Sequence, residues 1–288
     1  MDLLQRWVAR QFTTRVIVMM PVAIAINIVL GYTVQSVLKL PIYVDSIGTI
    51  LVGCVAGPLP GAITGILSNL IWQYAPGIGA GSSIGPFAVT AGVIGFMAGI
   101  WGYLGVFRSR PASGLRLIVP AAIAIAIIVL LAARMYTIPQ YSDPGMGYPS
   151  WVNVAIIGIG AAASISVALF VYLRRDAGGA WVAVAGAVTG IVAAIVSAPI
   201  AAVVYGGVTG AGTDVIVAAL RQGGADVYNA SLGQGLLSDP IDKTITSFLV
   251  FLILAGASSR FLARFPLGDR LVRVEASDAN DAGATDGN

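Results

Sequence analysis

Charged side chains stand at the start of long apolar segments, where they could bind a polar ligand. Asp45 opens one such segment, and Asp239, Asp242 and Lys243 open another. Ionisable groups at membrane depth are energetically costly, so each one marks a candidate site. Structural roles are the alternative: Asp45 or Asp239 could cap a helix, and Asp239 could pair with Lys243 one helical turn later.

Amide and aromatic side chains form a second candidate group. Asn69, Trp72 and Gln73 are spaced three and four residues apart, which places them on one face of a helix. Their polar groups can hydrogen-bond a ligand, and Trp72 can stack on a flat one. Trp72 could alternatively belong to an aromatic belt at a membrane interface.

A glycine-rich stretch occupies residues 205–214 (YGGVTGAGTD). It lacks the Lys of a phosphate-binding loop, and glycines near a membrane also permit tight helix packing. Tyr205 could stack on a ligand, while Thr209 and Asp214, with Asn229 further along, could hydrogen-bond it. The complete predicted substrate-binding set is Asp45, Asn69, Trp72, Gln73, Tyr205, Thr209, Asp214, Asn229, Asp242 and Lys243.

The sequence lacks the residues that common catalytic and metal sites require. It contains no His, and its one Cys, Cys54, lies in an apolar run. Imidazole zinc sites, His acid–base catalysis and internal disulfides are therefore excluded. No G-x-x-x-x-G-K-[ST] motif occurs, so the chain has no loop for ATP phosphates. Because no nucleophile stands beside a base, we expect a non-enzymatic protein without a cofactor or metal.

Composition defines the class of protein. Of the 288 residues, 57% are hydrophobic and 10% are charged, and the mean hydropathy is +0.89. A soluble domain averages about 25% charged residues and a disordered chain needs high charge, so both classes are excluded. The apolar segments are continuous and about 20 residues long, which favours helices over the alternating strands of a β-barrel. The predicted fold class is an all-α, polytopic transmembrane helix bundle.

Eight membrane spans are predicted. The second and third are short, meet at Gly57-Pro58-Leu59-Pro60, and could instead form one re-entrant hairpin. A basic, amphipathic lead-in occupies residues 1–15, the bundle residues 16–265, and an acidic, disordered tail residues 266–288. The predicted spans are residues 16–38, 44–57, 59–75, 86–107, 116–135, 151–173, 180–206 and 240–262.

The basic residues predict the orientation of the bundle. With the N-terminus inside the cell, most arginines fall on the cytoplasmic side, where Lys and Arg are retained. An even number of spans then places both termini in the cytoplasm of a multi-pass cell-membrane protein. The net charge of +3 comes from loop arginines, which suit anionic lipid headgroups rather than nucleic acid. The basic residues left outside are Lys39, Arg134, Arg221 and Lys243.

The predicted outer segments are longer and richer in glycine than the inner ones. They comprise residues 76–85, 136–150 and 207–239. In the last of these, the stretch from Thr213 to Arg221 has apolar residues at helical spacing. This pattern predicts either a structured lid or a solvated loop.

Several of these segments resemble S components, the substrate-binding membrane subunits of energy-coupling factor (ECF) transporters. Residues 45–50 (DSIGTI), the pair Gly57-Pro58 and the G-x-x-x-G-x-x-x-N spacing of residues 61–69 resemble the second and third helices of that family. Residues 205–210 (YGGVTG) and 239–243 (DPIDK) resemble the last two helices of an uncharacterised subgroup. The likeness covers most of the chain.

The resemblance implies a six-helix bundle that binds a vitamin or related micronutrient from outside. Such a subunit docks on a transmembrane coupling subunit with two ATPase subunits, and it topples in the membrane to release its ligand. Two departures follow. Residues 116–173 would form an inserted hairpin. The docking surface of the family, an Ala-x-x-x-Ala stripe, corresponds here to Ala23, Asn27 and Gly31, although Asn27 could instead hydrogen-bond between helices.

Two other functions remain open from the sequence. A stand-alone secondary transporter would need a coupling-ion site, and the two halves of the chain show no inverted repeat. A ligand-sensing membrane module would signal through a partner. The substrate is also open, because acids, amides and aromatic rings suit thiamine-like cations and flavins alike.

Overall fold

The structure is a computed structural model that describes residues 3–38, 40, 42–75, 84–136 and 150–272. Within these ranges the chain is all-α and forms no sheet, which confirms the predicted class. Two short segments, the π-helix η1 (Tyr32–Val37) and the 3₁₀ helix η2 (Gly85–Phe87), flank the cavity that is described below. A third, the 3₁₀ helix η3 (Gly268–Arg270), follows α11. The α-helices are α1 (Leu3–Gln11), α2 (Thr14–Gly31), α3 (Ile47–Ala56), α4 (Pro58–Tyr74), α5 (Ala88–Tyr103), α6 (Leu115–Tyr136), α7 (Ser150–Arg174), α8 (Gly178–Tyr205), α9 (Asp214–Gln222), α10 (Val227–Gly256) and α11 (Ser259–Leu262).

Five helical segments are long and apolar enough to cross a membrane, so the chain is a multi-pass membrane protein. The remaining predicted spans differ from this pattern for separate reasons. The 10 residues of α3 reach about 15 Å, which is half of the hydrocarbon thickness. Helix α4 is about one turn shorter than a typical membrane span. Helix α10 is long enough to be a span but carries charged side chains. The five segments are Thr14–Val37, Gly85–Tyr103, Leu115–Arg134, Ile157–Arg174 and Gly178–Tyr205.

A tight turn joins α3 to α4 at Gly57. Its φ of 123° is open only to glycine, and a Cβ there would lie 2.5 Å from Gln11 Oε1. That oxygen accepts a hydrogen bond from Leu59 N at 3.1 Å, and Pro58 begins α4 without needing a partner for its nitrogen. The predicted Gly-Pro turn is therefore confirmed, with α1 supplying the side chain that fixes it.

Helix α10 begins thirteen residues before the predicted start of the last span. Asp226 caps it by accepting a hydrogen bond from Asn229 N at 2.9 Å, and this bond lowers the pKa of the Asp226 carboxyl. Pro240, expected at the first turn, lies inside the helix, and Asp239 does not cap it. The prediction was wrong because a transmembrane helix tolerates an internal proline where neighbouring helices cover the gap.

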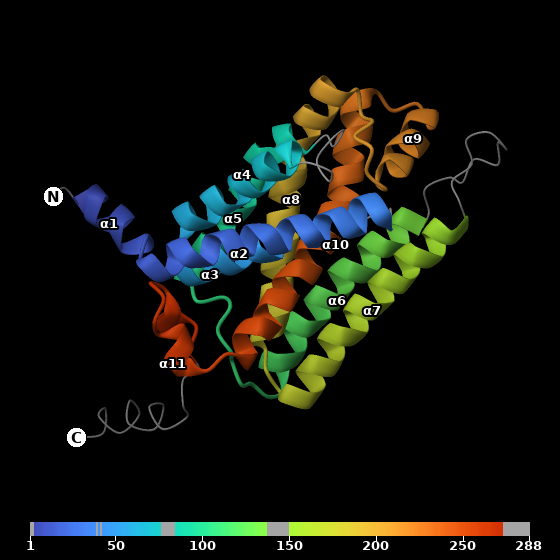
Figure 1. Ribbon diagram of the computed structural model, residues 1–288. Coiled ribbons are helices and arrows are strands. Elements are labelled where there is room, and N and C mark those ends of the chain that lie inside the picture. The colour runs from blue at the N-terminus through green and yellow to red at the C-terminus, as the bar shows by residue number, and fades with distance from the viewer. Residues whose placement is uncertain (1–2, 39, 41, 76–83, 137–149, 273–288) are drawn as a thin grey trace, which may run out of the picture.

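Glycines let α8 lie directly against α10. A Cβ at Gly190 would stand 2.4 Å from Asp239 O, and one at Gly186 would stand 2.4 Å from Lys243 O. Because glycine has no side chain beyond a hydrogen, the two helix backbones can approach closely, as is common where helices pack against each other in membranes. The two helices form the centre of the bundle, with α2 crossing them in the view of Figure 1. This contact places the charged turn of α10 inside the protein.

Helices α6 and α7 lie at one side of the bundle (Figure 1), where they pack against each other, and α6 also contacts α8 and α10. They correspond to the predicted hairpin of residues 116–173. Only about a fifth of each apolar window is buried within the chain, at 22% and 17%, so most residues of these two helices are not covered by the rest of the bundle. The predicted loops 76–85 and 136–150 lie almost wholly outside the described residues.

The C-terminal segment is ordered for longer than the sequence suggests. The predicted tail begins at residue 266, yet Leu267 and Leu271 are buried, and Leu267 N donates to Val55 O at 2.9 Å. Leu271 belongs to the main apolar core of the bundle. The rest of the tail, from residue 273, lies outside the described residues.

Arginines gather at one end of the bundle. Arg15 Nη1 donates to Arg264 O at 3.2 Å, and Arg108 Nε donates to Val272 O at 2.9 Å. Arg270 Nη1 donates to Tyr103 O at 2.8 Å. Segments from both halves of the sequence therefore meet at this arginine-rich end, which comprises Arg15, Arg108, Arg110, Arg264 and Arg270.

Candidate functional site

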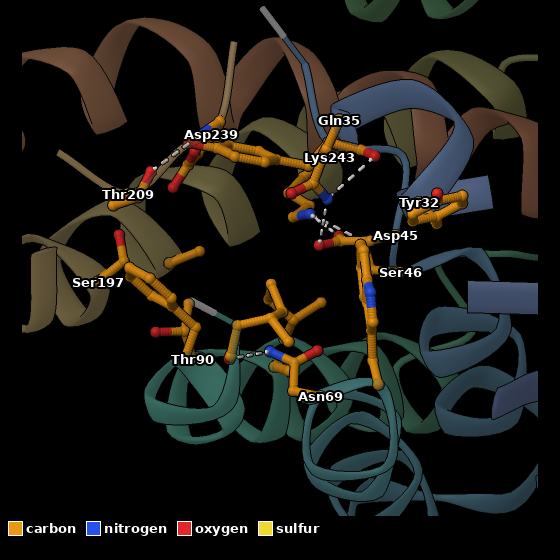
Figure 2. A pocket seen from close by; sticks show the side chains of 18 of the residues that line it. Tyr32, Gln35, Asp45, Ser46, Asn69, Thr90, Ser197, Thr209, Asp239 and Lys243 are labelled. Atoms are coloured by element: carbon orange, nitrogen blue, oxygen red, sulfur yellow. Dashed lines mark hydrogen bonds and ion pairs between the residues drawn. The ribbon is translucent and has the colours of Figure 1, made fainter. Parts of the chain in front are cut away.

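A cavity of about 340 Å³ lies at the end of the bundle opposite the arginine-rich end. Two helices show this position. Helix α2 starts at Thr14, beside Arg15, and ends at Gly31, beside the lining residue Tyr32, while α5 carries the lining residue Thr90 near its start and ends at Tyr103, close in sequence to Arg108. Figure 2 shows Asp239 and Lys243 on one side of the cavity and Asn69 and Thr90 on the opposite side. The polar and aromatic lining consists of Tyr32, Gln35, Ser36, Tyr43, Asp45, Ser46, Asn69, Trp72, Phe87, Thr90, Ser197, Thr209, Asp239 and Lys243.

Lys243 is the centre of the charged wall. Its ammonium donates to Asp242 Oδ2 at 2.6 Å, Ser46 Oγ at 2.8 Å and Asp45 Oδ1 at 3.4 Å. The predicted pairing of Lys243 with Asp239 is therefore wrong. Helical spacing favours that pair, but the start of α3 brings Asp45 and Ser46 close to the ammonium, and this tertiary contact decides the partners.

Asp242 holds the chain that precedes α3. Its Oδ1 accepts hydrogen bonds from Tyr43 N at 3.1 Å and Val44 N at 2.8 Å. Val44 has a φ of 54°, a left-handed conformation that a β-branched residue rarely adopts. Backbone strain of this kind persists where neighbouring contacts impose it, and it clusters at functional sites. Asp242 is fully buried behind the wall and positions Asp45 rather than lining the cavity.

Asp45 faces the cavity and does not cap α3. Gln35 Nε2 donates to its Oδ2 at 3.1 Å while Lys243 reaches its other oxygen. Gln35 belongs to the π-helix η1, a distortion that is frequent at functional sites. Gln35 could not be predicted from the sequence, because the π-helical turn that directs it inward has no reliable sequence pattern.

The Tyr43 hydroxyl joins three elements. It forms a 2.9 Å hydrogen bond with Thr213 Oγ1 and accepts one from Gln234 Nε2 at 3.1 Å. The Lys243 ammonium lies 5.9 Å from the centroid of its ring, within cation–π range. Tyr43 was not among the predicted residues. Its place two residues before Asp45, at the start of an apolar segment, was the available signal.

The Thr209–Ala211 segment forms another side of the cavity. Asp214 holds it by accepting hydrogen bonds from Thr209 N at 3.1 Å, Thr209 Oγ1 at 2.8 Å and Gly210 N at 2.6 Å. Asp214 also begins α9, which confirms that the Thr213–Arg221 stretch is helical. Its carboxylate therefore fixes the loop instead of facing the cavity.

Three hydrogen-bonding groups at the cavity have little or no partner among the described residues. Trp72 Nε1 and Thr90 Oγ1 have none, although the side chains are only 2% and 7% exposed. Asp239 is 5% exposed, and its carboxylate receives one long hydrogen bond, from Ser238 Oγ at 3.3 Å. Buried polar groups in proteins are nearly always paired, so these three groups are candidates for contact with a ligand.

The ten predicted substrate-binding residues occupy different positions. Tyr205 stacks on the lining residue Phe87 at 5.7 Å between ring centroids. Gln73 Oε1 accepts from Gly85 N at 2.9 Å and so holds the start of η2. Asn229 lies at the exposed start of α10 beside Asp226. The predicted residues that line the cavity are Asp45, Asn69, Trp72, Thr209 and Lys243.

The predicted docking stripe of Ala23, Asn27 and Gly31 is buried inside the bundle. Asn27 Nδ2 donates to Thr49 Oγ1 at 2.8 Å and to Ser68 Oγ at 2.9 Å, and its Oδ1 accepts from Gly48 N. The alternative interpretation of Asn27, hydrogen bonding between helices, is confirmed. The stripe ties α2 to α3 and α4 and is not an exposed surface.

The lining carries groups that can bind a small organic molecule. No group of three or more metal-ligating side chains occurs within the described ranges. The lining combines carboxylates, amides, hydroxyls and aromatic rings in a cavity large enough for a small organic molecule. Comparisons of the chain with protein-family models, curated proteins and solved structures gave no match.

Proposed function

We propose that this chain is a non-catalytic, substrate-binding subunit of an ECF-type importer, which captures a vitamin-like micronutrient in the cavity. The observation that carries the proposal is the cavity of about 340 Å³ lined by polar and aromatic side chains, among them Trp72 and Thr90, whose Nε1 and Oγ1 atoms have no partner among the described residues. Leaving such a group unpaired costs about 1–3 kcal/mol. A polar ligand removes that cost when it binds.

The proposed orientation places the arginine-rich end in the cytoplasm. Lys and Arg are retained on the cytoplasmic side of membrane proteins, and Arg15, Arg108 and Arg264 lie at this end. The cavity then opens toward the outside, where a nutrient would arrive. This arrangement supports uptake rather than export.

The proposed energy source lies in partner chains. The sequence has no loop for ATP phosphates, and the likeness of residues 45–69 and 205–243 to S components points to a transmembrane coupling subunit and two ATPase subunits. Because the Ala23–Gly31 stripe is internal, the coupling subunit would contact another face of the bundle.

The proposal is tested by coupling and by transport. The tagged full chain is purified in mild detergent from its native membranes, and co-purifying proteins are identified. We expect a coupling subunit and an ATPase pair, and ATP-dependent uptake of the co-purified small molecule when the complex is placed in liposomes. Uptake by this chain alone, driven by an ion gradient, would contradict the proposal and identify a secondary carrier.

A further inference from the structure

The charges at the cavity do not balance. Three carboxylates, those of Asp45, Asp239 and Asp242, surround a single ammonium, that of Lys243. Asp45 and Asp242 form ion pairs with Lys243 at 3.4 and 2.6 Å. Asp239 has no cationic side chain within 4 Å among the described residues. One negative charge at the cavity therefore lacks a partner.

Asp239 lies where a ligand in the cavity can reach it, and it is largely shielded from solvent. It lines the cavity from the interior of α10, and Gly190 of α8 brings a helix backbone directly against its own carbonyl. The side chain is 95% buried, since its exposed fraction is 5%. A buried charge is costly unless it is paired and hydrogen-bonded, and a positively charged ligand provides both.

An anionic ligand has no free cation to bind. The Lys243 ammonium has three N–H donors, and Asp242, Asp45 and Ser46 accept all three. No arginine is found among the described lining residues. A carboxylate or phosphate would therefore enter a cavity whose charge already opposes it.

The remaining lining suits a cation with an aromatic or hydrogen-bond-accepting part. Tyr43, Trp72 and Phe87 line the cavity, and aromatic rings attract positively charged nitrogen. Trp72 Nε1 is a donor without an acceptor among the described residues, and Trp72 lines the cavity. The Trp72 Nε1 donor requires an acceptor atom on the same ligand that carries the positively charged nitrogen.

We infer that the ligand of this cavity is a small organic cation whose positively charged nitrogen pairs with the Asp239 carboxylate, and whose acceptor atom receives the Trp72 Nε1 hydrogen bond. The inference rests on the proposed function and specifies its substrate class. It assigns Asp239 as the ligand's counter-ion and Asp45 and Asp242 as the partners of Lys243.

The experiment uses the full chain, purified in detergent and freed of ligand by washing. It is exposed to the small-molecule filtrate of yeast extract, washed and denatured, and the released molecules are identified by mass spectrometry. Asp239→Asn removes the charge at the cavity. Asp226→Asn is the matched control on the same helix, because it removes an exposed charge and Asn also caps helices.

We expect the unsubstituted chain and Asp226→Asn to retain a molecule with a positively charged nitrogen at pH 7, and Asp239→Asn to retain about 10- to 100-fold less. A retained molecule that is neutral or anionic overturns the inference and leaves the proposed function standing. The charge of the retained molecule is measured on the unsubstituted chain, so this outcome does not depend on whether a variant folds. Retention by Asp239→Asn equal to that of the control also overturns it. Retention of nothing by the unsubstituted chain contradicts the proposed function itself.

Discussion

Asp176 and Asp239 are buried to the same extent, yet their surroundings differ completely. Each is 5% exposed. Asp176, between α7 and α8, accepts hydrogen bonds from the Ser109 hydroxyl and, at 2.7 Å each, from the N–H groups of Arg110 and Gly178. Asp239 accepts one hydrogen bond, at 3.3 Å. The first carboxylate is satisfied by the fold, and the second is not.

The difference shows that burial alone does not identify a binding group. Asp176 joins the segment that follows α5 to the segment between α7 and α8. Its hydrogen bonds are complete without a ligand. Asp239 differs because the two neighbouring carboxylates, Asp45 before α3 and Asp242 on α10, both pair with Lys243. The informative property is a buried polar group that lines the cavity and has little or no partner among the described residues.

The largest effect is expected for Asp242, a satisfied carboxylate three residues from Asp239. Asp242→Ala removes the 2.6 Å ion pair and the acceptor of Tyr43 N and Val44 N. Because Lys243 would remain buried, we expect unfolding free energy to fall by about 4 kcal/mol, measured by denaturant titration in detergent. The double variant Asp242→Ala with Lys243→Met should lose less than the two single losses added together. Additive losses would show that the pair is not coupled.

A somewhat smaller loss is expected at the arginine-rich end. Asp176→Ala leaves the Ser109, Arg110 and Gly178 donors without their acceptor, and we expect a destabilisation of about 3 kcal/mol. Ligand binding should be unchanged in the fraction that folds, because the substituted residue does not line the cavity. If thermal unfolding in detergent were unaltered, Asp176 could not serve as the satisfied half of the comparison.

The close contact behind Asp239 can be tested with a matched pair of glycines. An Ala at Gly190 would place its Cβ 2.4 Å from Asp239 O, whereas no atom lies within 4 Å of a Cβ at Gly256. We expect Gly190→Ala to cost about 2 kcal/mol and Gly256→Ala to gain about 0.5 kcal/mol from helix propensity. Equal unfolding temperatures for the two variants would mean that α8 does not restrain the charged turn of α10.

The smallest expected change is at Asp239 itself. In the ligand-free protein, Asp239→Asn removes a buried charge with no ion-pair partner, so stability should be unchanged or should rise by about 1 kcal/mol. The opposite sign from Asp176→Ala is the sharpest form of the comparison, and thermal unfolding of the washed protein measures it. A loss of about 2 kcal/mol or more would show that the fold depends on the Asp239 carboxylate.

The sequence was sufficient for the class of fold and for much of the cavity. Long apolar segments predicted an all-α membrane protein, and the Gly57-Pro58 turn was correctly located. Asp45, Asn69 and Lys243 were singled out because polar groups are expensive in apolar segments, and they do line the cavity. These predictions rest on composition and local spacing, which need no tertiary information.

The remainder depends on contacts between distant segments. Pro240 suggested a helix start, but packing against α8 lets α10 continue through it. Lys243 was paired with Asp239 by spacing, whereas the start of α3 supplies Asp45 from nearly 200 residues away. Tyr43 and Gln35 are directed inward by a strained turn and a π-helix. None of these arrangements has a local pattern from which it could be predicted.

The account is tested most directly by native mass spectrometry of the full chain, purified from cells grown in rich medium. It predicts one small molecule bound to each chain, released on activation. It predicts a bare chain for Ser197→Trp, which fills the cavity from a half-buried position on α8. A bare mass for the unsubstituted chain, or the same adduct on Ser197→Trp, would contradict the assignment of this cavity as a binding site.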